Sequence, residues 1–247
     1  MCVDDCRRRR THGLDALLLA QAVYLRWTVL RLPEPRGSRN GVAGHGPLLR
    51  VLILGDSSAA GVGVDHQDEA LLGQLTDRLS SYATVDYKLL AVTGARTGDV
   101  LGWVDQLPSV PFDVVVVALG VNDVTKGVSL RKWLRQTASL LDRLVTDFDA
   151  RYVFVSGLPP MRDFPLLPQP LRWVLGRQAD RFDRALHAMV ETRDDATRIT
   201  IDMRLNEGNM SADGFHPGAD VYAAWADEVA AGILERPALL DVARSNA

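Results

Sequence analysis

From Leu48 onward, short runs of almost purely apolar residues alternate with longer stretches of helical character. The run Val114–Leu119 reads VVVVAL and the run Leu49–Leu54 reads LRVLIL, so both faces of these segments are apolar. Such strands are typical of a parallel sheet that is covered by helices on both faces. We therefore expect a three-layer α/β/α sandwich whose functional groups follow the carboxyl ends of the strands. The candidate strands are Leu49–Leu54, Val85–Val92, Val114–Leu119, Tyr152–Val155 and Ile199–Ile201, and the candidate helices are 67–81, 98–107, 129–147, 171–194 and 218–235.

Composition and charge narrow the class of protein. A chain of 247 residues with 47% hydrophobic residues can bury the core of one α/β domain and leave a tail. The formal net charge of -3 argues against a nucleic-acid partner, because such proteins usually carry a basic face. Cys2 and Cys6 lie in the N-terminal tail, so we expect no disulfide framework in the core. No cluster of histidine, cysteine and carboxylate residues has the spacing of metal ligands, and we expect neither a metal nor a cofactor.

The first 47 residues are predicted to lie outside the main domain. Pro33–Pro47 is rich in Gly, Pro and Arg, which indicates a linker. Before it, Leu14–Leu32 is apolar but interrupted by charged residues, and its uninterrupted core, Ala16–Ala20, is too short to span a bilayer. An amphipathic helix packed on the domain is favoured, and peripheral membrane contact through residues 14–32 and a cleaved or spanning segment stay open as alternatives. The predicted divisions are an N-terminal tail, helix and linker at 1–47, a domain at 48–237 and a C-terminal tail at 238–247.

The cellular compartment is weakly constrained. Two cysteines in a tail do not distinguish a reducing from an oxidising environment. We expect a cytoplasmic protein, which is membrane-associated if the segment 14–32 touches a bilayer.

Gly55-Asp56-Ser57-Ser58 follows the first strand and opens toward a helix. Glycine permits a tight turn, and a serine at a helix start meets the positive end of the helix dipole, so Ser57 is a candidate nucleophile. The simplest alternative is a helix cap, because Ser and Asp are preferred capping residues. The stretch lacks the lysine and the spacing of a P-loop. It also fails as the G-x-S-x-G elbow of α/β-hydrolases, whose serine follows several strands and whose acid stands well before its histidine.

Two further turns follow candidate strands. Gly120-Val121-Asn122-Asp123 ends the most hydrophobic strand, and asparagine is usually found in such a turn because it tolerates left-handed backbone geometry. At the carboxyl end of a strand, however, the Asn122 amide could donate a hydrogen bond to an oxyanion. Gly94 occupies another strand-to-helix turn, where its backbone N–H could do the same.

Asp213-Gly214-Phe215-His216-Pro217 precedes the last candidate helix. A turn at Gly214 could let the Asp213 carboxylate reach Nδ1 of His216 and leave Nε2 free to take a proton from a serine. The alternative is an ordinary surface-loop histidine. The remaining histidines are interpreted as structural, and they are His12, His45, His66 and His187.

The ordered blocks resemble those of the GDSL esterase/lipase family, specifically the SGNH hydrolases, which are named for the Ser, Gly, Asn and His of four blocks. The resemblance spans about residues 48–235, and Asp213 matches the acid of the D-x-x-H block. Ser58 stands where the GDSL name has leucine. The resemblance implies a flavodoxin-like fold with a five-stranded parallel sheet and metal-independent hydrolysis of acyl esters. The residues that match the four named blocks, in order, are Ser57, Gly94, Asn122 and His216.

The resemblance also implies roles for these residues. Ser57 would attack the acyl carbonyl, His216 would take its proton and Asp213 would orient the imidazole. The oxyanion hole would consist of the backbone N–H groups of Ser57 and Gly94 together with the side-chain amide of Asn122. The expected partner is a small-molecule acyl ester, with short to medium acyl chains favoured.

The substrate is less constrained than the chemistry. The segment Gly157–Pro170 is apolar and stiffened by prolines, and it follows the fourth strand, so it either walls an acyl pocket or packs as a surface loop. An acyltransferase, a lysophospholipase and a carbohydrate deacetylase are alternatives on the same fold. A non-catalytic module would lack Ser57 or His216, and a flavin or nucleotide binder would need a phosphate loop that residues 55–63 do not provide. The oligomeric state is left open.

Overall fold

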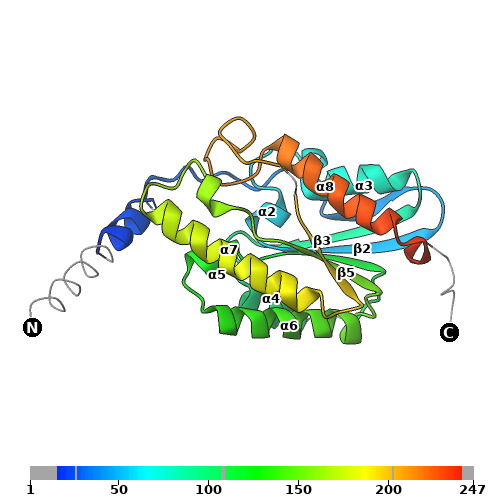
Figure 1. Cartoon of the computed structure of the whole chain (residues 1–247). Coiled ribbons are helices and arrows are strands. Elements are labelled where there is room, and N and C mark those ends of the chain that lie inside the picture. Colours follow the sequence, from blue (N-terminus) through cyan, green and yellow to red (C-terminus); the bar gives the residue numbers. More distant parts are fainter. Residues whose placement is uncertain (1–15, 26, 107–108, 202, 241–247) are drawn as a thin grey trace, which may run out of the picture.

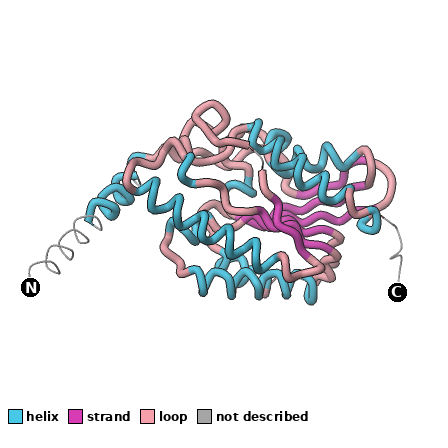
Figure 2. The backbone as a smooth tube through the Cα atoms, in the orientation of Figure 1, coloured by secondary structure: helices cyan, strands magenta, loops and turns pink. Residues whose placement is uncertain are grey.

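The computed structural model of the chain describes residues 16–25, 27–106, 109–201 and 203–240. Its centre is a six-stranded sheet with helices on both faces, and the strand order is β1-β3-β2-β4-β5-β6 (Figure 1). The tube view shows the strands as one twisted layer between two layers of helices (Figure 2). The strands are β1 (Asn40–Gly44), β2 (Leu48–Gly55), β3 (Thr84–Ala91), β4 (Val114–Ala118), β5 (Tyr152–Ser156) and β6 (Ala196–Ile199).

The strands β2 to β6 are mutually parallel where they pair, and β1 joins β3 in the antiparallel sense. The predicted three-layer α/β/α fold is therefore confirmed, and the sheet has one strand more than the five expected. β4 is buried along its whole length, in agreement with its continuous run of valines.

β1 lies inside the stretch that the composition predicts to be a linker. Its sequence, NGVAG, carries one branched apolar residue and two glycines, so no local pattern marks it as a strand. It forms because β3 would otherwise present an open edge, and Val42 pairs with Asp86 in that ladder. Residues 40–44 therefore belong to the sheet, and the linker interpretation of this part of the segment is wrong.

Two groups of helices cover the sheet. α3 and α8 pack against each other on one face, where the core includes Ile53, Val116 and Phe154. α4, α6 and α7 cover the other face, where the core includes Leu54 and Val117 (Figure 1). The α-helices are α2 (Ser57–Ala60), α3 (Leu71–Ser80), α4 (Thr97–Val104), α5 (Val121–Thr125), α6 (Leu130–Asp147), α7 (Leu171–Val190) and α8 (Ala219–Leu234), and the 3-10 helices are η1 (Gln67–Glu69), η2 (Met161–Asp163) and η3 (Pro237–Leu239).

Several helices differ from their expected bounds. α6 begins one residue later than expected because Ser129 is its N-cap, whose hydroxyl accepts a hydrogen bond from the Lys132 N–H. The expected helix at 67–81 is split into η1 and α3, because Ala70 between them has an extended backbone. The short helices α2 and α5 are absent from the expected helix ranges, although the Gly55–Ser58 block indicates a helix start at Ser57, and both follow a strand closely.

The strand order decides where the site forms. From β2 the chain crosses to β3 on one side and then to β4 on the other, so the winding direction reverses at β2. A reversal of this kind opens a crevice at the carboxyl ends of the strands. Ser57 follows β2, Gly94 follows β3 and Asn122 follows β4, so the topology collects all three at one edge.

The N-terminal segment contributes a helix that includes residues 16–25 (Figure 1). Among the residues that the structure describes, no helix combines the length and the apolar character that crossing a membrane requires.

Candidate active site

Three side chains form one hydrogen-bonded line at the carboxyl edge of the sheet. Ser57 Oγ lies 2.9 Å from Nε2 of His216, and Nδ1 of His216 lies 2.6 Å from Oδ2 of Asp213. Ser57 is 6% exposed, and the side chains of His216 and Asp213 are 15% and 1% exposed. The serine hydroxyl therefore has an imidazole within proton-transfer distance, and the other nitrogen of that ring is bound to a buried carboxylate.

Ser57 owes its position to a tight strand-to-helix turn. It is the first residue of α2 and follows the last residue of β2 by only two positions. A Cβ on Gly55 would stand 2.4 Å from the Ala59 Cβ and 2.5 Å from the Ala118 carbonyl oxygen, so only glycine fits there. The helix ends at Gly61, whose backbone has a φ of 91°.

The loop before α8 holds His216 by way of Asp213. Oδ1 of Asp213 accepts hydrogen bonds from the Ser211 hydroxyl and from the backbone N–H groups of Phe215 and His216 at 2.8 to 2.9 Å. Gly214, with a φ of 63°, supplies the turn that lets the carboxylate bend back on the chain. Burial by itself raises the pKa of the Asp213 carboxyl, but the hydrogen bonds from His216 and Phe215 outweigh burial and hold this pKa well below its usual range. Asp213 is therefore ionised at neutral pH.

Asn122 is linked to the turn that carries Ser57 by Asp56, a residue whose sequence position indicated only a helix cap. Nδ2 of Asn122 donates to Oδ2 of Asp56 at 2.9 Å, and Oδ1 of Asp56 accepts from the Ser58 N–H at 3.0 Å. Asp56 is 3% exposed. Burial raises its pKa to about 6 against the opposing effect of these two hydrogen bonds. The carboxylate leaves one N–H of the Asn122 amide for another acceptor.

Gly94 lies in the turn after β3 with a φ of 83°. Its carbonyl oxygen accepts a hydrogen bond from Nζ of Lys126 at 2.5 Å, and Lys126 is the C-cap residue of α5. This contact connects the turn after β3 to α5, which also carries Asn122. The structure therefore brings together the predicted triad and links both Asn122 and Gly94 to neighbouring turns of the same edge.

A second buried carboxylate lies beneath this edge. Oδ2 of Asp123 accepts hydrogen bonds from the backbone N–H and the hydroxyl of Thr97 at 3.0 and 2.9 Å, and the Thr97 hydroxyl accepts one from Trp133 Nε1. Asp123 is fully buried, which raises its pKa. This network fixes the start of α4 to α5. Asp56 and Asp123 are next to Ser57 and Asn122 in the sequence. This position is the sequence signal that could have found them, because an aspartate beside a site residue can bind the backbone or side chains around that residue.

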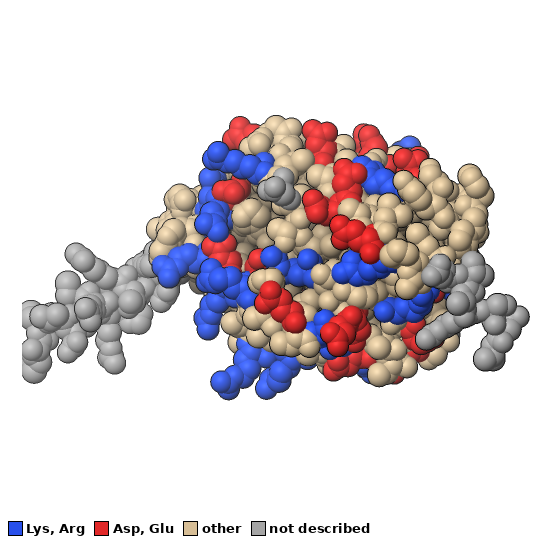
Figure 3. Space-filling view, turned by 45° about the vertical axis from the view of Figure 1, so that its right-hand side comes forward, with Lys and Arg blue, Asp and Glu red and all other residues tan. Residues whose placement is uncertain are grey.

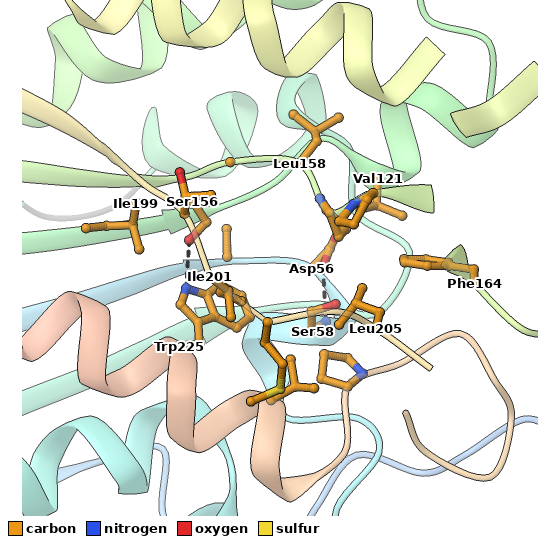
Figure 4. Close-up of a pocket in the computed structure, with 18 of the residues that line it drawn as sticks. Asp56, Ser58, Val121, Ser156, Leu158, Phe164, Ile199, Ile201, Leu205 and Trp225 are labelled. Carbon is orange, nitrogen blue, oxygen red and sulfur yellow. Dashed lines mark hydrogen bonds between the residues drawn. The ribbon is translucent and has the colours of Figure 1, made fainter. Parts of the chain in front are cut away.

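A cavity of about 110 Å³ opens next to Ser58, the residue that follows Ser57 (Figure 4). In this view Asp56 and Ser58 lie between Phe164 on one side and Ser156, Ile199 and Trp225 on the other. Most of its wall is apolar, and Trp225 Nε1 donates to the Ser156 hydroxyl at 3.1 Å. The segment predicted to wall a pocket contributes Gly157, Leu158, Pro159, Pro160 and Phe164. Lining residues that the sequence did not indicate include Thr200, Ile201, Met203, Leu205, Met210, Val221 and Trp225.

The family model of the GDSL-like lipase/acylhydrolase family matches residues 53–224 of this chain. The chain therefore belongs to that family, as the four sequence blocks predicted, and it is a carboxylic ester hydrolase. It is similar to the GDSL-like esterase Rv1075c of Mycobacterium tuberculosis, at 28% identity over 241 residues that cover 87% of this chain and 75% of the relative.

Solved structures agree on the fold. The lipase Lip_vut3 from a goat rumen metagenome superposes with a TM-score of 0.62 at 16% identity, covering 74% of this chain and 96% of that one. The psychrotrophic esterase EstA from Pseudoalteromonas sp. superposes with a TM-score of 0.58 at 19% identity, covering 76% of this chain and 98% of that one. At these identities the likeness establishes the shared fold.

Proposed function

We propose that this protein is a serine esterase that hydrolyses small carboxylic esters with short to medium acyl chains. The observation that carries the proposal is the hydrogen-bonded line from Ser57 through His216 to Asp213. A serine hydroxyl becomes a nucleophile when a neighbouring imidazole accepts its proton. A carboxylate on the far ring nitrogen holds the imidazole in the required tautomer and stabilises the imidazolium that forms.

Two half-reactions follow from this arrangement. Oγ of Ser57 forms a bond to the acyl carbon while its proton passes to Nε2 of His216, and the carbonyl electron pair moves to the oxygen. The tetrahedral species then expels the alcohol, which leaves with the proton from His216, and an acyl-serine remains. Water attacks this ester, again giving its proton to His216, and the carboxylic acid departs as Ser57 regains its proton.

The negative oxygen of each tetrahedral species needs hydrogen-bond donors. We assign this role to the backbone N–H groups of Ser57 and Gly94 and to the amide of Asn122. Two observations support the assignment: Ser57 stands at the start of α2, and the Asn122 amide has an N–H that Asp56 does not use. Removing one such donor typically lowers turnover by about 10²–10³.

The cavity beside Ser58 is the proposed acyl site. An apolar cavity of about 150 Å³ holds a benzene molecule, so a cavity of about 110 Å³ suits an acyl chain of a few carbons. Its apolar wall favours a hydrocarbon chain over a sugar or a charged group. These features favour a short-chain esterase over a carbohydrate deacetylase.

The identity of the nucleophile is tested with a fluorophosphonate probe. The probe should label Ser57 in the wild type, and Ser57→Ala should abolish both labelling and ester hydrolysis. Ser58→Ala is the matched control, because it removes a hydroxyl from the adjacent residue and keeps the N–H that Asp56 accepts. Labelling that is lost in Ser58→Ala and kept in Ser57→Ala would overturn the assignment.

The chain-length preference is tested with p-nitrophenyl esters of increasing acyl length. The ratio kcat/KM should be highest for short or medium chains and fall for long ones. Adding a soluble alcohol such as glycerol separates hydrolysis from acyl transfer. Free acid as the main product supports the proposal, and a glyceryl ester as the main product identifies an acyltransferase.

A further inference from the structure

The N-terminal helix presents apolar side chains to solvent. Leu19 is 67% exposed, Tyr24 is 65% exposed and Trp27 is 84% exposed, and Leu17 and Val23 are nearly half exposed. A helix on the surface of a monomer normally turns charged or polar residues outward. A contiguous row of exposed large apolar residues marks a surface that binds something.

This helix is held on the domain by its opposite side. Nε2 of Gln21 donates to the Gln169 carbonyl oxygen at 2.7 Å, and the Leu171 N–H donates to Oε1 of Gln21 at 3.2 Å. Leu25 packs against the core that lies under α7. The exposed apolar row is therefore fixed next to the first turn of α7, and both views show the helix at that end of the molecule (Figures 1 and 2).

One exposed face of α7, the helix whose first residue donates its N–H to Gln21, is aromatic and cationic. Trp173 is 53% exposed, and the Arg177 guanidinium lies 4.8 Å from the centre of its ring. Arg181 and Arg184 continue the exposed stripe along α7. Within the described part of the chain, no carboxylate forms an ion pair with these three arginines, and the two aspartates on the same helix have other partners: Asp180 pairs with Arg162 and Asp183 pairs with Arg198. Lys and Arg side chains gather at the end from which the helix projects (Figure 3).

We propose that these residues form a docking surface for anionic phospholipid bilayers. The N-terminal docking surface consists of Leu17, Leu19, Val23, Tyr24 and Trp27 of the N-terminal helix and Trp173, Arg177, Arg181 and Arg184 of α7. Apolar and aromatic side chains insert at the level of the headgroups, and arginines attract anionic lipids. Charge argues for a membrane over a second copy of the chain, because two copies meeting through this surface would bring their arginines together.

The docking surface adjoins the loop that walls the cavity. Gln169 and Leu171, which Gln21 binds, follow Phe164 in the chain, and Phe164 lines the cavity. The same loop is joined to the histidine loop, because the Leu166 N–H donates to the Gly214 carbonyl oxygen at 3.0 Å. A bilayer on this surface therefore lies next to the cavity wall. The membrane contact does not depend on the proposed chemistry.

The test is flotation of the full chain with vesicles of phosphatidylcholine alone and of phosphatidylcholine mixed with phosphatidylglycerol. We expect binding to the mixed vesicles and its weakening as salt is raised. Arg177→Gln with Arg181→Gln should weaken binding about thirtyfold, because each arginine near an anionic surface contributes about fivefold. Tyr24→Ser with Trp27→Ser should also weaken it.

Tyr82→Ser is the matched control. Tyr82 is 55% exposed and precedes β3, so it lies at the amino edge of the sheet, away from the N-terminal docking surface. This variant should bind vesicles as the wild type does. All variants should hydrolyse a short soluble ester at the wild-type rate, which separates this test from failure of the proposed function. No flotation of the wild type, or equal flotation of all variants, would overturn the proposal, as would a dimer that the Tyr24 and Trp27 substitutions dissociate.

Discussion

At the scale of single residues, the Asp56 carboxylate accepts hydrogen bonds from two different turns. One oxygen caps α2 through the Ser58 N–H, and the other holds the Asn122 amide, so one carboxylate sets the relative position of the turns after β2 and β4. This carboxylate is buried, and burial raises its pKa to about 6. Asp213 is the opposite case, because its hydrogen bonds outweigh its burial and lower its pKa.

The raised pKa of Asp56 predicts a pH-dependent stability. A carboxyl whose pKa is higher in the folded state than in the unfolded chain stabilises the fold fully when the pH is below its pKa in the unfolded chain. This contribution is lost as pH rises through the folded-state pKa of about 6. The free energy of unfolding should therefore fall by about 2 kcal/mol between pH 4 and pH 7 on account of this group. Urea unfolding at several pH values measures it.

Asp56→Asn should flatten this dependence, because an amide does not titrate. A smaller slope of the same sign should remain, since burial also raises the pKa of Asp123. The Asp213 carboxyl does not interfere, because its lowered pKa places its loss of stabilisation at more acidic pH. If the variant kept the wild-type slope, Asp56 would not be the titrating group.

We predict that the substitution Asp213→Asn lowers turnover and preserves the fold. The amide oxygen of asparagine can still accept the three hydrogen bonds that Oδ1 receives, but its NH₂ would face Nδ1 of His216. The imidazole would then take the wrong tautomer, and kcat should fall by about 10⁴. Steady-state kinetics and thermal melting of the variant measure the two effects.

Asp220→Asn is the control for this substitution, since Asp220 is exposed at the start of α8. It should keep wild-type kcat. EDTA should leave the wild-type rate unchanged, because the proposed mechanism activates the serine with His216. Strong inhibition by EDTA that a divalent ion reverses would contradict that mechanism.

At the scale of elements, short helices that follow the strands position the candidate site residues. α2 and α5 are four and five residues long, and they begin just past β2 and β4, the strands at the point where the winding direction reverses. α5 carries Asn122 on its first turn and Lys126 at its end, so it contacts both flanking turns. By contrast, β1 pairs with β3 alone in the sheet and lies on the edge farthest from β6.

β1 should therefore matter for stability and not for chemistry. A protein beginning at Pro33 should melt slightly below the full chain, because it loses the hydrogen bonds of Gln21 and the packing of Leu25, whereas one beginning at Pro47 also lacks β1 and leaves the β3 edge open. Each kcal/mol lost should lower Tm by about 2–4 °C. Both proteins should hydrolyse a short soluble ester at similar rates. If the shorter protein stays folded and loses this activity, residues 33–46 contribute to the site.

A substitution in the loop after β6 should change the preference for acyl-chain length. Ile201 lines the cavity and is only partly buried, so Ile201→Phe should fill part of the 110 Å³ with little cost to the core. We expect kcat/KM for p-nitrophenyl octanoate to fall about tenfold or more, because one misfitting methylene already costs about tenfold. The acetate ester should be hydrolysed nearly as by the wild type.

Leu166→Phe is the matched control for this substitution, because Leu166 lies in the proline-rich segment and does not line the cavity. It should leave the ratio of octanoate to acetate hydrolysis unchanged. An unchanged ratio in Ile201→Phe as well would show that the acyl chain binds elsewhere.

At the scale of the whole molecule, strand order converts separated blocks into one site. Ser57 and His216 are 159 positions apart in sequence, and Asp56 and Asn122 are 66 apart, yet both pairs are within hydrogen-bond distance. They meet because the winding reverses at β2, so that the turns after β2, β3 and β4 share one edge and the loop before α8 lies over it.

The sequence by itself determined the parallel sheet, most helices and the catalytic candidates. Runs such as VVVVAL are stable only when both faces are covered, and α6 needs one buried stripe, so burial specifies these elements locally. Ser57, Asn122 and His216 follow from the order of short blocks, because each block carries its own turn residues.

The tertiary structure alone decided β1, the link from Asp56 to Asn122 and most of the cavity wall. β1 has no strand pattern of its own and forms on an edge that β3 provides. The cavity is bounded by Ile201, Leu205 and Trp225, whose local sequence is equally compatible with an ordinary core. These features depend on contacts between distant segments, and their energy exists only after the sheet has brought those segments together.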